Sequence, residues 1–249
     1  MRGFIYIILG LLILGCENDN APECFRAQGE IETRNFDVPF FDRVRFEDDV
    51  SLMIKQGEEQ SVTITSGENL FDEINVAVEG KTLVIQDTNG CNLVREIGIT
   101  QAVITTPNLI EIRNGSSRDV RSNGILNFPR LTLISNTTGG FVGIKKSGDF
   151  YLNLNCSEFV LRANGQSAFY LSGSTEQAQI TFNDEAPRLE GANFTINHLD
   201  LFHRGANKMI VNPRLSIVGE LRSTGDVIAV NRPDSISVRE LFSGQLIFQ

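Results

Sequence analysis

Carboxylates are the residues in this chain best suited to hydrolytic chemistry, and they form two clusters. One comprises Glu47, Asp48 and Asp49, and the other comprises Asp184 and Glu185. Glycoside hydrolysis needs two carboxyl groups held at a set separation across the scissile bond. Adjacent residues of a strand point to opposite faces, so neighbouring acids are poorly placed to act together. We therefore interpret both clusters as solvated acidic edges, which discourage edge-to-edge pairing of strands.

The two histidines, His198 and His203, are the other candidates for acid–base chemistry. In an uninterrupted strand their rings would face opposite sides, whereas Asp200 and Phe202 would share the side of His198. A His/Asp pair suggests a hydrolase, but the chain has no serine in a G-x-S-x-G elbow. We expect both histidines to be structural.

Motifs for metals or cofactors are absent from the sequence. No CxxC motif or Cys/His cluster predicts a zinc site, and no Asp-rich nonapeptide repeat predicts calcium. The chain has 17 Phe, 3 Tyr and no Trp, which weighs against a dedicated lectin with aromatic sugar platforms. We predict no metal and no cofactor. The small basic clusters are interpreted as solvated turns, with an anion site as the alternative: Lys145, Lys146, Arg113, Arg118 and Arg121.

The overall composition indicates a folded, acidic protein. The 249 residues carry a formal net charge of −9, and 41% of them are hydrophobic. That apolar content suffices for a buried core and excludes a disordered chain. The acidic balance argues against nucleic acid as a partner, because phosphate binding needs an excess of Lys and Arg.

The first residues have the pattern of a targeting signal. Met1 and Arg2 supply positive charge, and Phe4 to Leu14 form an apolar run that is much shorter than the roughly 20 residues of a bilayer span. Ile13-Leu14-Gly15-Cys16 resembles the bacterial lipobox, which implies a signal peptide over residues 1–15 and lipidation of Cys16, palmitate included. Residues 16–23 would be the lipidated tether. An ordinary signal peptide with an incidental cysteine remains the alternative.

Four cysteines occur, at positions 16, 24, 91 and 156. A secreted protein meets an oxidising compartment, in which a disulfide persists. If Cys16 carries lipid, the other three make one bridge and one leftover thiol, and spacing alone does not choose the pair. For Cys156 we expect a free, packed thiol.

Period-two alternation of apolar and polar residues dominates the rest of the chain. It is clear in Ser51–Lys55, Ser61–Thr65 and Thr82–Gln86, and Gly-bearing turns separate such runs. Only Asn69–Ile74 could support a short helical turn. The sequence therefore predicts an all-β fold, with an N-terminal β region over residues 24–106.

From residue 107 onward, short strands recur at steps clustering near twenty residues. This period predicts a parallel β-helix, or β-solenoid, over residues 107–249, because a coil buries its apolar face only by stacking on its neighbours. A meandering β-sandwich with coincidental spacing is the alternative. The register between Leu131 and Gln179 stays open, since Phe159 could also begin a coil. The expected coil starts are Leu109, Leu131, Tyr151, Gln179, Leu199, Leu215 and Ile236.

Several longer segments resemble one known family. The matching stretches are Cys24–Ile31, Phe41–Gly57, Gly67–Ile74, Asn89–Arg95 and Gly225–Val230. Together they resemble the head GIN-domain family of adhesins, found as lipoproteins in Bacteroidetes, over roughly residues 24–233. The resemblance implies a β-solenoid body, a surface or periplasmic role described as adhesion, and no established catalytic residues. Because the family segment matching 89–95 carries a second cysteine, the resemblance also implies a Cys24–Cys91 disulfide.

These observations predict a non-enzymatic lipoprotein adhesin of the outer membrane, exposed at the cell surface, with the periplasmic side as the alternative. Its expected partners are the membrane, through Cys16, and a glycan or protein ligand. Two other functions stay open: an enzyme acting on polysaccharides, and a structural envelope protein that self-associates as a homo-oligomer. Asp234-Ser235-Ile236 also matches a short O-glycosylation motif, which leaves modification of Ser235 open.

Overall fold

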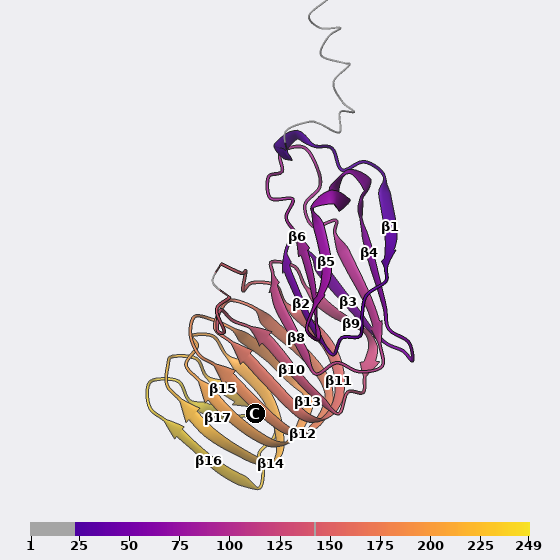
Figure 1. Ribbon diagram of the computed structural model, residues 1–249. Coiled ribbons are helices and arrows are strands. Elements are labelled where there is room, and N and C mark those ends of the chain that lie inside the picture. The colour runs from indigo at the N-terminus through magenta and orange to yellow at the C-terminus, as the bar shows by residue number, and fades with distance from the viewer. Residues whose placement is uncertain (1–22, 142) are drawn as a thin grey trace, which may run out of the picture.

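The computed structural model describes residues 23–141 and 143–249, and it is an elongated all-β body (Figure 1). The 17 strands of these described segments belong to one hydrogen-bonded sheet that curls around the core and nearly closes on itself. The all-β prediction is confirmed. Within the described part, helical structure is confined to two 3-10 turns, η1 (Glu23–Phe25) and η2 (Glu68–Glu73). The second of these turns coincides with the segment expected to be helical.

The N-terminal end of the sheet is mixed. There β1 (Ile31–Phe36) pairs antiparallel with β4 (Ser61–Gly67), and β4 pairs antiparallel with β7 (Gln101–Thr106). A second antiparallel pair joins β5 (Ile74–Glu79) to β6 (Thr82–Asp87). β7 and β6 each pair on with a separate series of parallel strands. We call these two series the first and second faces of the body.

The first face continues from β7 through β3 (Ser51–Gln56) and β9 (Val120–Leu126). The second face continues from β6 through β2 (Arg43–Asp48), β8 (Glu111–Ser116) and β10 (Arg130–Ser135). Thus β2 and β3 pair with strands that lie beyond residue 106. The hydrogen-bonded ladders run across the expected domain boundary at residues 106 and 107, and that boundary stays a prediction.

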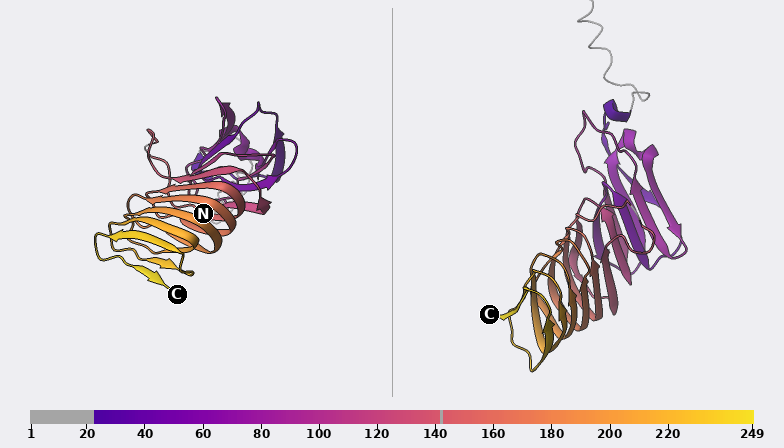
Figure 2. Two further views of the ribbon diagram at one scale, coloured as in Figure 1. Left: turned by 90° about the horizontal axis from the view of Figure 1, so that it is seen from below. Right: turned by 90° about the vertical axis from the view of Figure 1, so that its left-hand side faces the viewer.

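The next strands are long enough to serve both faces, and we call this part the parallel stack (Figure 2). In each long strand the N-terminal half extends the first face and the C-terminal half extends the second. At the far end, β15 and β17 extend the first face, and β16 extends the second. The strands of the stack are β11 (Phe150–Ala163), β12 (Ala168–Phe182), β13 (Arg188–His203), β14 (Met209–Leu221), β15 (Val227–Ala229), β16 (Ser235–Glu240) and β17 (Leu246–Phe248).

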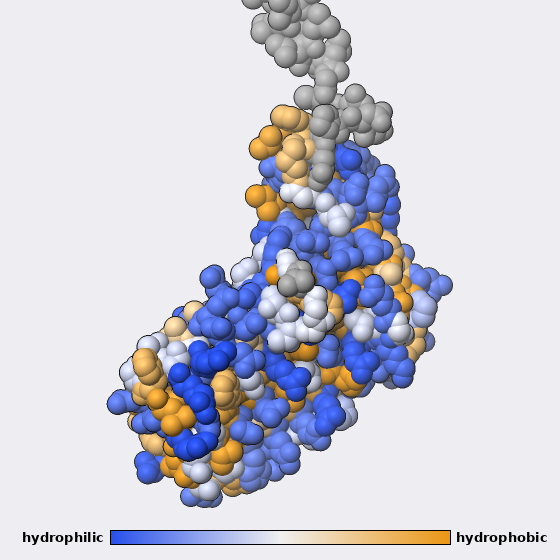
Figure 3. Space-filling view, turned by 60° about the vertical axis from the view of Figure 1, so that its left-hand side comes forward, coloured by the Kyte–Doolittle hydropathy of each residue, from blue (hydrophilic) through white to orange (hydrophobic). Residues whose placement is uncertain are grey.

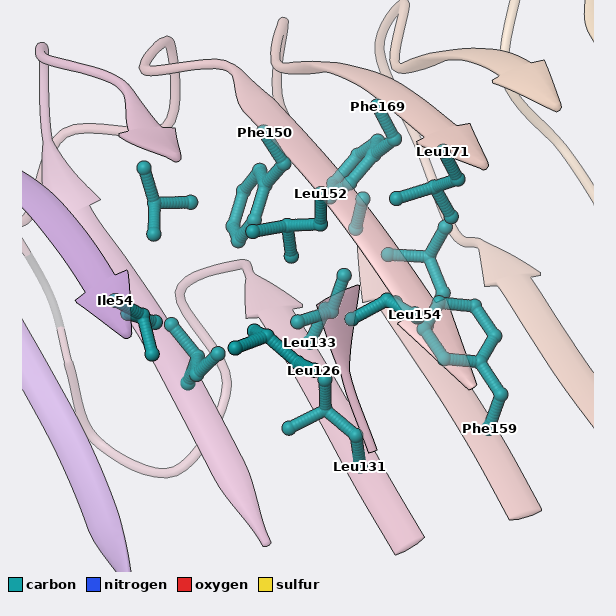
Figure 4. Packing of buried hydrophobic residues seen from close by; sticks show 14 of the residues in the cluster. Ile54, Leu126, Leu131, Leu133, Phe150, Leu152, Leu154, Phe159, Phe169 and Leu171 are labelled. Carbon is teal, nitrogen blue, oxygen red and sulfur yellow. The ribbon is translucent and has the colours of Figure 1, made fainter. Parts of the chain in front are cut away.

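Parallel register places equivalent residues of the stack directly over one another. Phe150, Phe169, Leu189 and Met209 form one such inward column, and successive members lie 19 or 20 residues apart. The rings of Phe150 and Phe169 stack with centroids 4.6 Å apart (Figure 4). One apolar cluster runs between the two faces, from Phe41 to Ala229. Burying it is the main stabilising contribution to the fold.

One expected strand start needs correction. Tyr151 lies on the first face, whereas Leu131 pairs with Phe159 on the second face, so Phe159 is the equivalent position. The 28-residue step from Leu131 to Phe159 arises because residues 136–141 and 143–149 belong to a long connection between β10 and β11. Parallel pairing at a nearly constant step is what a solenoid needs, but the β-helix assignment itself stays a prediction.

Candidate functional site

A groove of about 400 Å³ crosses the outer surface of the second face, over β10 to β14. Its walls combine hydrogen-bonding side chains with small apolar ones such as Val160 and Val218. We call it the second-face groove. Its polar residues are Arg130, Glu158, Gln177, Gln179, His198, Asp200 and Ser216.

Register brings these polar residues together from strands that are about twenty residues apart in sequence. Gln177 pairs with His198, and His198 pairs with Ser216, which makes one row across the groove. A second row contains Gln179 beside Asp200. Alternation turns both rows outward, and neighbouring strands stand about 4.8 Å apart. The groove therefore offers regularly spaced hydrogen-bonding groups on a rigid surface.

Some of the groove residues are already engaged and others are available. His198 Nδ1 lies 2.9 Å from Ser216 Oγ, and Arg130 Nε donates to Glu158 Oε2 at 2.6 Å. By contrast, the side chains of Gln177, Gln179 and Asp200 make no hydrogen bond or ion pair with any described residue. Planar amides and carboxylates that are free to bond suit the hydroxyl groups of a neutral polar ligand.

A second hollow of about 430 Å³ lies where β2 and β6 end, against residues 88–100, and we call it the junction pocket. Four carboxylates line it: Asp48 and Asp49 come from the first sequence cluster, and Asp87 and Glu96 join them. Lys145 reaches it from the long connection and donates to the Asp48 carbonyl oxygen at 3.0 Å. The junction pocket is lined by more charged side chains than the second-face groove.

The three aspartates of the junction pocket have different surroundings. Asp49 accepts from Arg118 Nε at 2.6 Å, and Asp87 accepts from Thr100 Oγ1 at 2.5 Å. The Asp48 carboxylate accepts no hydrogen bond from the described residues, and its backbone lies in the left-handed region at φ 65°. Burial raises the pKa of Asp48 above its ordinary value, and the nearby Lys145 opposes that shift. The interpretation of this cluster as a sheet edge is wrong, because Glu47 and Asp48 end β2, which pairs with β6 on one side and β8 on the other. Asp48 and Asp49 instead form part of a pocket wall.

The remaining acids and bases identified from sequence are dispersed. Glu185 pairs with Lys146, and Asp184 is exposed beside Arg204. The interpretation of Arg113 as a solvated turn residue is wrong, because it lies buried on β8. Its guanidinium stacks 4.4 Å from the Phe141 ring centroid and donates to the Asn136 carbonyl at 3.1 Å. Phe141 and Asn136 belong to the long connection between β10 and β11, and strand periodicity does not predict where that connection lies.

The histidines lie on opposite sides of β13, as alternation predicts. His198 is exposed in the second-face groove, whereas His203 is fully buried against Phe182. His203 Nε2 lies 2.9 Å from the Asn207 carbonyl oxygen, and Nδ1 is buried without a partner. The ring is therefore neutral with its proton on Nε2, and burial lowers the pKa of His203 below its ordinary value of 6.5.

Acid should destabilise the protein through His203. Because its folded pKa is lowered, the unfolded chain takes up the proton first, and this contribution to stability is present above pH 6.5 and lost as pH falls below it. Urea unfolding of the wild type and a His203→Leu variant between about pH 8 and 5 should show a smaller pH dependence in the variant. Equal pH dependence in the two proteins would contradict this role for His203.

Three of the four cysteines and Ser235 lie among the residues that the structure describes. Cys24 and Cys91 form a disulfide, with Cα atoms 4.5 Å apart. Cys156 is free and half-buried, and burial raises the pKa of its thiol. Ser235 is exposed on β16. The expected lipidation site Cys16 lies outside the described residues, as do the signal peptide and most of the tether.

No group of three or more His, Cys, Asp or Glu side chains in residues 23–141 and 143–249 is arranged to hold a metal ion. Over the same segments, no helix has the length and apolar character needed to cross a bilayer. Neither Gln177 nor Gln179 was identified from the sequence as a ligand-binding residue, because an outward glutamine on a strand looks the same whether or not a groove surrounds it.

The fold and the groove define an elongated all-β protein with a ligand-sized surface groove on one face. Its sequence belongs to the family described as "Putative auto-transporter adhesin, head GIN domain", whose profile matches residues 40–233. The resemblance identified from the sequence is thereby confirmed. No curated protein sequence matches the chain.

Solved structures from Bacteroidetes share the fold. A "putative adhesin" from Bacteroides fragilis NCTC 9343 is 19% identical, with a TM-score of 0.79 over 90% of this chain and 100% of that one. A "putative lipid binding protein" from Parabacteroides distasonis ATCC 8503 is 14% identical, with a TM-score of 0.61 over 89% and 97% of the two chains. A "putative adhesin" from Parabacteroides merdae ATCC 43184 is also 14% identical, with a TM-score of 0.60 over 88% and 97%. At these identities the likeness establishes the fold.

Proposed function

We propose that this protein is a non-enzymatic adhesin, lipidated at Cys16 and held at the outer face of the outer membrane. Residues 107–249 form a β-solenoid rod that continues the N-terminal β region of residues 24–106. The adhesin descriptions of the family and of two structural neighbours support the role. The parallel register and the repeating step of the stack support the solenoid.

The ligand we assign to the second-face groove is a neutral glycan. The observation that carries this proposal is the pair of in-register rows, in which the side chains of Gln177, Gln179 and Asp200 have no hydrogen-bond or ion-pair partner among the described residues. Val160 and Val218 supply apolar surface for the carbon–hydrogen faces of a sugar. The net charge of −9 makes an acidic ligand a poor match by repulsion.

Glycan-array binding of the mature protein tests this assignment. Gln179→Ala should weaken binding about tenfold, because it leaves a ligand hydroxyl without its partner. Asp200→Asn should also weaken binding, because a neutral amide oxygen replaces a charged acceptor. Asp234→Asn is the matched control, since this exposed acid lies outside the groove and should bind as the wild type does. Absence of glycan binding, or groove variants indistinguishable from the control, would contradict the assignment.

Protease shaving of intact cells, followed by intact-mass measurement of the extracted protein, tests the anchor and the location. We expect the protein to be lost from intact cells, and we expect a lipid adduct on Cys16 in unshaved samples. Full protection would place the protein on the periplasmic side and would count against adhesion to external targets.

A polysaccharide-active enzyme is the second candidate, and Asp48 is the observation that favours it. A carboxyl group with a raised pKa in a pocket can donate a proton to a leaving group. In that case glycan cleavage would be detectable, and Asp48→Asn would abolish it. Self-association of the rod remains a prediction, tested by light scattering at high protein concentration.

A further inference from the structure

Large apolar side chains are exposed at the N-terminal end of the body. We call this surface the apolar tip; its members are Phe25, Leu93, Val94 and Ile97, which are 58%, 69%, 58% and 70% exposed. Apolar residues gather at the end of the molecule where the described chain begins (Figure 3). Such a concentration of exposed apolar side chains usually marks an interaction surface.

The loop that carries the tip is held in place rather than loose. The Cys24–Cys91 disulfide joins it to η1, and Leu93 N donates to the Cys24 carbonyl oxygen at 3.0 Å. Within the loop, the Asn92 side chain accepts from Arg95 N at 2.9 Å and donates to the Arg95 carbonyl at 2.8 Å. These bonds keep Leu93 and Val94 pointing outward, so their exposure is a built feature of the protein.

The position of the tip along the chain indicates what covers it. Seven peptide steps separate Cys16 from Glu23, so a lipid on Cys16 lies at most about 25 Å from the start of the described chain. The disulfide places residue 91, and with it the loop of Leu93 to Ile97, beside Cys24. The apolar surface is thus the part of the body that the anchor holds nearest to the bilayer.

We propose that the apolar tip inserts into the lipid surface to which Cys16 is anchored, so that the protein has a second membrane contact. The apolar faces of interfacial segments are buried about 5–10 Å into the boundary between headgroups and acyl chains. Two contacts restrict the tilt of the rod and turn the parallel stack away from the membrane. The inference rests on the proposed anchor, but the tip can be tested separately.

A tryptophan reporter tests insertion, because the chain has no Trp and a single substitution provides a unique fluorophore. Leu93→Trp places it on the tip, and Phe242→Trp places it at the far end of the stack, where Phe242 is a similar 66% exposed. Both acylated proteins are reconstituted into phosphatidylcholine vesicles with brominated acyl chains. We expect quenching and a blue shift at position 93 and neither at position 242.

A second measurement removes the anchor. In the unacylated Cys16→Ser chain, Leu93→Ser and Ile97→Ser should each lower partitioning into phosphatidylcholine vesicles about tenfold. Phe242→Ser is the control and should leave partitioning unchanged. Unfolding curves of all variants check that these exposed substitutions leave the fold intact.

The outcomes separate the tip from the anchor. A lipid adduct on Cys16 with an unquenched tryptophan at position 93 overturns the tip and leaves the anchor standing. Quenching at position 93 without an adduct supports the tip and overturns the anchor. A blue shift that appears without vesicles as protein concentration rises makes a second copy the occupant and overturns the lipid proposal.

Discussion

Replacing Gly173 with alanine should cost more than about 4 kcal/mol of unfolding free energy, because the new side chain has no space and its backbone is strained. Gly173 lies on β12 with φ +104°, in register with Leu154 of β11. A Cβ atom there would overlap the Leu154 carbonyl oxygen. That oxygen belongs to the neighbouring strand, so the overlap can be relieved only by moving β11 and β12 apart.

Gly124→Ala is the matched control for this prediction. Gly124 also has a positive φ, +87°, but a Cβ atom there would meet nothing within 4 Å. Its substitution should cost only the strain of the left-handed conformation, about 1–2 kcal/mol. Urea unfolding followed by circular dichroism compares the two variants. A similar loss of unfolding free energy in the two variants would show that the close approach of β11 to Gly173 does not determine the cost of a side chain there.

Removing the disulfide should have the next largest effect. The Cys24–Cys91 bridge closes a loop with a sequence separation of 67 residues. In the chain-entropy model, opening a loop of that length lowers the unfolding free energy by about 4 kcal/mol, since the unfolded chain regains freedom. The double variant Cys24→Ser/Cys91→Ser should therefore unfold at much lower urea concentration than the wild type.

Cys156→Ser controls for the loss of a cysteine as such. Its thiol is free and half-buried, so we expect a cost of about 1 kcal/mol or less. Reducing agent should shift the wild-type curve toward that of the double variant and leave the double variant unchanged. If the double variant matches Cys156→Ser, the bridge contributes little to stability.

The sequence by itself determined the properties that depend on neighbouring residues. Alternation predicted the all-β class and the opposite placement of His198 and His203, because side chains of a strand alternate by geometry alone. The short helical turn near Asn69 also followed from local pattern. The family was recognisable because its segments keep characteristic residues over most of the chain.

Only the tertiary structure decided which strands lie side by side. β2 pairs with β8, whose residues lie 68 positions further along the chain, as in Arg43 and Glu111. Leu131 is equivalent to Phe159 rather than to Tyr151. Local pattern carries no information on such pairings, because any alternating segment presents the same edge hydrogen bonds to every other. The burial of Arg113, the second-face groove and the junction pocket all depend on pairings between distant segments, and for that reason they could not be derived from the sequence.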